Sequence, residues 1–96
     1  MQGNDKFHRD NVYRRNPEVF GATIDGEEVI MSVKHGQYYG LEGVGLRVWE
    51  LIEEPRSFEQ LVDHIQEEFE VDLEVCEKDL VAFLTEMERL ELIERG

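Results

Sequence analysis

The chain has 96 residues, with 10 Lys and Arg against 23 Asp and Glu, and a formal charge of −13 at pH 7. A chain of this length forms one small domain that buries roughly 60–70% of its unfolded surface, which leaves little room for a deep catalytic cavity. The charge disfavours nucleic acid and anionic membranes as partners, because binding to phosphate depends on Lys and Arg. The excess acid lies at residues 42–94, which hold seventeen acidic and four basic side chains. A basic or neutral protein partner is therefore expected.

Residues 1–17 are polar and show no sustained periodicity. Because such termini are commonly mobile, we expect a flexible arm over residues 1–17 and a folded domain over residues 18–96. The longest unbroken apolar run, at residues 80–84, is far shorter than the about 20 residues that span a bilayer, and the N-terminus has no apolar signal core. These features predict a cytoplasmic protein that does not bind membranes.

Alternating apolar and polar residues predict three strands after the arm. The first two alternating sets are Phe20, Ala22 and Ile24, then Val29, Met31 and Val33, and the third strand is the aromatic segment 37–41. Asp25-Gly26 favours a tight turn between the first two, because a primed hairpin turn requires positive φ. His35-Gly36 marks the second turn. The sequence thus predicts a three-stranded antiparallel meander.

The apolar spacing then changes to that of helices. The spacing of Leu46, Val48, Trp49 and Ile52 places them on one helical face, and Pro55 ends this helix because proline cannot continue one. Ser57 and Gln60 have the spacing of a capping box at the start of the next helix. Asp72 is a suitable N-cap for the last helix, which runs to about Leu90. Three strands followed by three helices indicate an α+β fold.

Residues that could carry catalysis or hold a metal are scattered. Cys76 lies in a helical pattern beside Glu77 and Asp79, whose charge raises a thiol pKa, so we interpret it as a small buried apolar residue. The three histidines fall on the arm, a turn and a helix, which does not form a ligand cluster. The glycines between strand and helix match neither the dinucleotide fingerprint nor a phosphate loop. We therefore expect no enzyme activity, no metal and no cofactor.

The third strand, residues 37–41, carries two tyrosines and neither a charge nor a proline. An unprotected edge strand presents free N–H and C=O groups, which an extended peptide can use to join the sheet. Two alternatives remain open for this segment. The strand could be central, or Tyr38 and Tyr39 could simply pack on the core.

The chain resembles the PqqD-like family over about residues 18–94, and looks most like the stand-alone members of lasso-peptide clusters. The matching residues are Gly36-Gln37-Tyr38-Tyr39-Gly40-Leu41, Gly45, Val48-Trp49, Leu51-Ile52, Pro55, Leu61, Val71-Asp72, Asp79, Phe83-Leu84 and Leu90-Glu91-Leu92-Ile93. One departure is Glu91, where many members have a small residue or glycine.

This resemblance implies a winged helix-turn-helix-like fold that binds the leader segment of a ribosomally made precursor peptide. The leader would lie as an added strand between the third strand and the last helix. The implied contact residues are Gln37, Tyr38, Tyr39, Gly40 and Leu41 on the strand and Cys76, Asp79, Leu80, Phe83 and Met87 on the helix. Helical spacing does not decide whether the four apolar residues of the helix face the core or a ligand. Asp79 would pair with a leader Lys, Arg or N–H, or remain a solvated charge.

The resemblance also implies that the protein is not an enzyme and delivers the leader to a leader peptidase and a lasso macrocyclase. An alternative is that it serves a different maturase, such as a radical SAM enzyme. A winged-helix DNA binder is a third possibility, which the acidic helical half disfavours.

Overall fold

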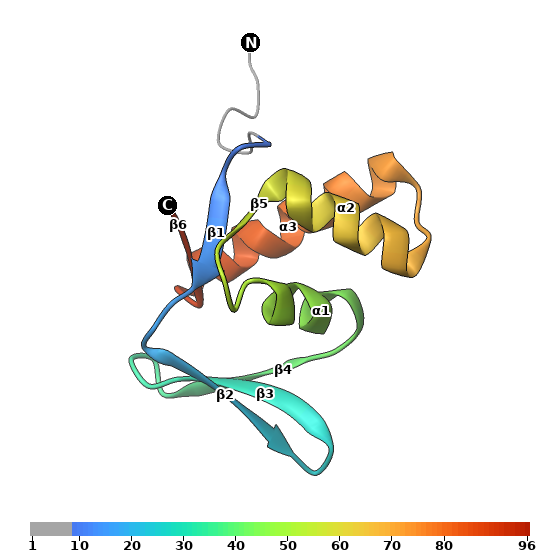
Figure 1. Cartoon of the computed structure of the whole chain (residues 1–96). Helices are drawn as coiled ribbons and strands as arrows, with labels where there is room; N and C mark the ends of the chain where they lie inside the picture. Colours follow the sequence, from blue (N-terminus) through green and yellow to red (C-terminus); the bar gives the residue numbers. More distant parts are fainter. Residues whose placement is uncertain (1–8) are drawn as a thin grey trace.

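The computed structural model describes residues 9–96, which form two three-stranded sheets and three helices (Figure 1). The elements in chain order are β1 (Val12–Arg15), β2 (Val19–Ile24), β3 (Glu27–Ser32), β4 (Gln37–Leu41), α1 (Gly43–Leu51), β5 (Arg56–Ser57), α2 (Phe58–Phe69), α3 (Leu73–Arg89) and β6 (Ile93–Arg95). Helix α1 lies between the β2–β3–β4 sheet and the other two helices (Figure 1). Across residues 9–96, no helix combines the length and the apolar character needed to cross a membrane.

Strands β2, β3 and β4 form the antiparallel meander that the sequence predicts. Asp25 and Gly26, with φ angles of 53° and 82°, make the two-residue turn between β2 and β3. Both angles are positive, as a primed hairpin turn requires. Strand β3 is the central strand of this sheet, and β2 and β4 are its edges.

The second sheet, in the order β5-β1-β6, joins segments that are far apart in the sequence. Strand β1 pairs antiparallel with both neighbours, and its Tyr13 is fully buried. The expectation of a flexible arm is therefore wrong for residues 12–15. Residues 1–8 of that arm lie outside the described residues. The alternation of apolar and polar residues did not predict this sheet, because β5 and β6 have only two and three residues and are too short to show it.

The helices begin and end close to the predicted positions. At the start of α2, Ser57 Oγ accepts a hydrogen bond from the Gln60 N–H at 3.1 Å, and the Ser57 N–H donates to Gln60 Oε1 at 2.9 Å. This confirms the capping box. Asp72 occupies the N-cap position of α3, although its side chain makes no capping hydrogen bond. Helix α3 ends at Arg89, one residue before the predicted end.

The core lies between the three helices and the inner face of the meander, the face that packs on α1. Trp49 of α1 is buried, and the Arg15 guanidinium lies 4.4 Å from the centroid of its ring. Arg15 also donates from Nε and Nη2 to the Trp49 carbonyl oxygen at 2.9 and 2.6 Å. A Cβ at Gly21 of β2 would lie 3.3 Å from Trp49 Nε1, so this glycine lets the sheet approach the indole. The α+β class is confirmed, and the second sheet makes the likeness to a winged helix-turn-helix loose.

Candidate functional site

Strand β4 has an open side, because it is the last strand of its sheet. In an antiparallel sheet, successive residues direct their N–H and C=O groups alternately to one side and to the other. Ile24 and Glu27 flank the two-residue turn, so their backbone groups bond to each other. Alternation along β3 from Glu27 then directs the backbone groups of Ile30 toward β4, where Ile30 pairs with Tyr39. The neighbours of Tyr39, which are Tyr38 and Gly40, therefore present their backbone groups on the open side. This edge can accept a further strand.

The two tyrosines of β4 lie on opposite faces of the sheet, because side chains alternate along a strand. Tyr39 is partly buried on the inner face, and its hydroxyl donates to Gln37 Oε1 at 3.2 Å. Tyr38 lies on the outer face and is 69% exposed. The alternative in which both tyrosines pack on the core is therefore wrong for Tyr38, and the alternative of a central strand is wrong for β4.

Three of the proposed helix residues belong to the core. Cys76, Leu80 and Met87 have exposed fractions of 2%, 1% and 4%. The Cys76 thiol donates to the Val62 carbonyl oxygen at 3.8 Å. Burial raises the pKa of this thiol, and the charges of Asp79 and Glu77 raise it further. In this structure the core interpretation therefore holds for these three residues.

Phe83 and Asp79 are the two proposed helix residues that reach the surface. Phe83 is half-buried, and a Cβ built at Gly45 of α1 would lie 3.0 Å from Phe83 Cε1. The ring therefore lies directly against the first turn of α1, which follows β4. Asp79 is exposed and lies one helical turn before Phe83. Both residues lie on a flank of α3 rather than on its buried stripe.

Glu91, which follows α3, contacts the turn before β4, and the sequence did not indicate this contact. Glu91 Oε1 lies 2.9 Å from His35 Nε2 and 3.1 Å from Lys34 Nζ. Hydrogen bonds from Lys34 and then His35 lower the pKa of Glu91. Arg89 lies close enough to Tyr39 for an electrostatic interaction between the two side chains. The only feature of the sequence that pointed to this contact was Glu91 itself, which departs from the family pattern.

A pocket of about 470 Å³ lies at the other end of β4, next to the start of α1. Its lining includes Gly40 and Leu41 from β4 and the three acidic residues Glu27, Glu28 and Glu42. These carboxylates favour a cationic or neutral group over an anion. Within residues 9–96, no group of three or more His, Cys, Asp or Glu residues is arranged to hold a metal ion.

The chain belongs to the PqqD family. The model of this family, described as coenzyme PQQ synthesis protein D, matches residues 27–93, which cover β3 to β5 and all three helices and end at the first residue of β6. The resemblance inferred from the residues is thus confirmed. A comparison with curated proteins finds no match.

Two solved structures are similar to this fold. The first is described as TbiB1 in complex with the TbiA(beta) leader peptide, with 40% identity, a TM-score of 0.77, and coverage of 84% of this chain and 94% of that chain. The second is described as lasso peptide synthetase B1 complexed with the leader peptide, with 21% identity, a TM-score of 0.75, and coverage of 85% and 96%. The second likeness concerns the fold alone.

Proposed function

We propose that this protein recognises the leader segment of a ribosomally made precursor peptide in lasso-peptide biosynthesis. The observation that carries the proposal is the open side of β4, where Tyr38 and Gly40 present backbone groups. The 40% identity to TbiB1, which is described in complex with a leader peptide, supports it. The leader adds to β4 as a further strand, and backbone hydrogen bonds hold it there.

The side chains of the added strand alternate between the two faces of the sheet. Those on the inner face pack against Tyr39, Leu41 and Phe83, which are partly buried and apolar. Gln37 sits at the start of β4 and positions the Tyr39 hydroxyl. Asp79 is the acidic group on this flank of α3, and it pairs with a basic side chain or an N–H of the leader. These side-chain contacts give the site its specificity, and the strand edge gives it affinity.

The protein itself performs no chemistry in this proposal. It acts in the cytoplasm and holds the leader while a leader peptidase acts on the attached peptide, after which a lasso macrocyclase acts on the released segment. A short flexible tether raises the effective concentration of the downstream segment at a partner's active site to about millimolar. Co-purification with a radical SAM enzyme instead of a leader peptidase would assign the protein to another pathway of peptide modification.

Amide hydrogen exchange with and without a leader peptide tests the proposal. The TbiA(beta) leader peptide and the leader of the protein's own precursor are the probes, and a scrambled peptide of the same composition is the control. We expect slower exchange at Tyr38 and Gly40, whose N–H groups face the open side, and little change at Tyr39, whose N–H already faces β3. Binding without protection at β4, or no binding to either leader, would rule the proposal out.

A further inference from the structure

The pocket at the end of β4 lies where the pairing of β3 with β4 stops. The last paired residues are Glu28 and Leu41, and beyond them the chain turns at Glu42 into α1, so Glu27 has no partner in β4. The β2–β3 turn and the connection from β4 to α1 lie at the same end of the sheet (Figure 1), and both contribute to the lining of this pocket of about 470 Å³. The pocket is continuous with the edge strand proposed to bind the leader, because Gly40 and Leu41 belong to both.

The lining of the pocket combines apolar surface with negative charge. Leu41 and Leu46 contribute apolar side chains, and the charged groups are the carboxylates of Glu27, Glu28 and Glu42. A Lys or Arg side chain has the matching two parts, an apolar stem and a cationic head, and it commonly lays the stem on apolar surface while the head reaches polar groups. The pocket therefore fits a basic side chain better than a purely apolar one.

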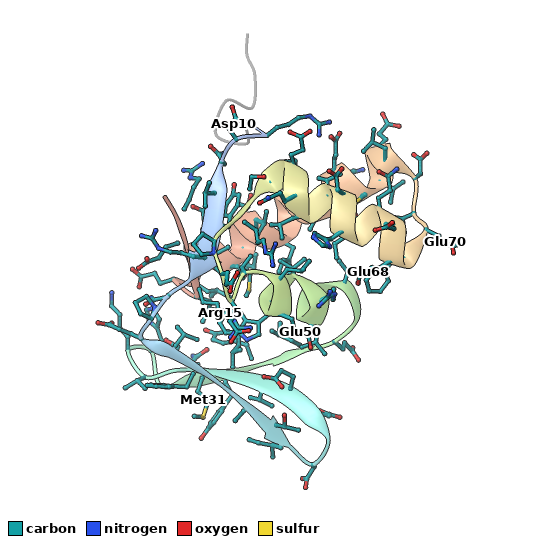
Figure 2. The ribbon with its side chains drawn as sticks, viewed as in Figure 1. Asp10, Arg15, Met31, Glu50, Glu68 and Glu70 are labelled. Carbon is teal, nitrogen blue, oxygen red and sulfur yellow. The ribbon has the colours of Figure 1, made fainter. Side chains whose placement is uncertain are left out.

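Within residues 9–96, no cation of the protein forms an ion pair with any of these three carboxylates. Glu28 accepts a hydrogen bond from Thr23 Oγ1 at 3.1 Å, which holds its side chain in place. The basic residue of α1, Arg47, is engaged elsewhere. It pairs with Glu68 at 2.7 Å and with Glu50 at 3.3 Å, and Figure 2 shows Glu68 beside α1. The three negative charges are therefore available to a cation from another chain.

The two ends of the β2–β3–β4 sheet differ in charge. Residues 19–46, which form this sheet and the start of α1, hold four acidic side chains, one Lys and no Arg. All four acidic residues lie at the pocket end, namely Asp25, Glu27, Glu28 and Glu42. Lys34 lies in the turn at the opposite end, where it pairs with Glu91 at 3.1 Å. A cationic side chain of a guest strand is therefore attracted to the pocket end.

We propose that this pocket binds a Lys or Arg side chain of the leader, and that it makes the protein selective for leaders with a basic residue at that position. The inference rests on the proposed function and adds a determinant of register to it. A shift of the guest by two residues keeps each side chain on its own face of the sheet, so the strand edge alone does not decide which leader residues pair with Tyr38 and Gly40. A basic side chain held in the pocket decides it, because only one stretch of the guest lies next to the end of β4.

The test removes the charge of two exposed pocket residues in the double variant Glu27→Gln/Glu42→Gln. Glu28 is kept, because its carboxylate bonds to Thr23. The matched control is Glu53→Gln/Glu54→Gln, which changes the net charge by the same amount at exposed residues beyond the other end of α1. The probe is the labelled leader of the protein's own precursor, together with a series in which each of its Lys and Arg residues is replaced in turn by Gln. Fluorescence titration measures affinity, and thermal unfolding checks that each variant is folded.

We expect the pocket variant to bind the leader about fivefold more weakly than the wild type at low ionic strength, and the control variant to bind within about twofold of it. The difference should shrink with added salt, because the Debye length falls from about 30 Å at about 0.01 M to about 3 Å at about 1 M. One Lys→Gln or Arg→Gln leader should lose a similar factor with the wild type and little with the pocket variant, since both changes remove the same interaction.

Equal losses in the pocket and control variants would overturn this assignment, and so would a leader that binds the wild type but has no Lys or Arg coupled to the pocket variant. Either result leaves the added strand on β4 intact as a proposal. Failure of the wild type to bind the leader would overturn the proposed function, and the pocket assignment with it.

Discussion

Gly40→Pro is the sharpest test of the open edge. Proline removes a backbone N–H, and the N–H of Gly40 is one of the groups that alternation directs away from β3. The substitution therefore leaves the hydrogen bonds between β3 and β4 intact. Gly40 does not have a positive φ, and a Cβ built on it meets nothing within 4 Å. Proline is tolerated on edge strands, so we expect the variant to fold.

The expected loss of leader affinity follows from the missing donor. An intramolecular hydrogen bond contributes a net of about 0.5–1.5 kcal/mol, and an acceptor left unpaired in a buried position costs about 1–3 kcal/mol. The pyrrolidine ring also occupies the space from which the N–H would reach a guest carbonyl. Together these effects lower the affinity by roughly tenfold or more. Gly40→Ala keeps the N–H and should change the affinity by less than about twofold, because its methyl group points into open space.

Fluorescence titration of a labelled leader peptide measures the effect, with thermal unfolding as the check on folding. If Gly40→Pro and Gly40→Ala bind the leader equally well while both remain folded, then the guest does not bond to Gly40 and the inferred edge is wrong. Tyr39→Pro supplies the opposite comparison. It removes an N–H that faces β3, so it should lower the thermal stability of the protein itself.

Three further predictions address the flank of α3, the buried strand and the end of the chain. Phe83→Ala should weaken leader binding by about 1 kcal/mol or more, and Tyr38→Ala by less, because Tyr38 lies on the outer face; equal losses by titration would contradict this assignment. Tyr13→Ala should lower the free energy of unfolding by about 3–5 kcal/mol in urea titrations, as loss of a large buried ring does, and no change would mean that β1 is dispensable. Glu91→Gln should be less stable than wild type near neutral pH, and the difference should shrink as the pH falls through the lowered pKa of Glu91; a difference that persists in acid would exclude the ion pairs as its cause.

The meander and the helices could be predicted because local sequence determines them. Asp25-Gly26 specifies a turn that few other dipeptides form, and the spacing of Ser57 and Gln60 specifies a helix start. Strand β1 could not be predicted, because its partners come from distant parts of the chain and contribute only two or three residues each. Its sequence, Val-Tyr-Arg-Arg, carries little alternation of its own.

The helix wall of the site stays a prediction, because a helical stripe does not reveal what covers it. Cys76, Leu80 and Met87 share a face with Phe83 in the spacing, yet they are buried while Phe83 is half-exposed. The difference arises where α3 passes α1, since Gly45 leaves room there for the Phe83 ring. This packing depends on a tertiary contact between Gly45 and Phe83, which are 38 positions apart in the sequence.

Glu91 connects the departure from the family pattern to the geometry of the site. Its φ of 62° is a left-handed conformation that glycine adopts more freely than a residue with a side chain. In a residue with a side chain this conformation costs about 1–2 kcal/mol. The carboxylate offsets part of this cost by pairing with His35 and Lys34 at the turn before β4. These contacts connect the turn before β4 to the segment that follows α3, so the stability of Glu91→Gln reports on this connection.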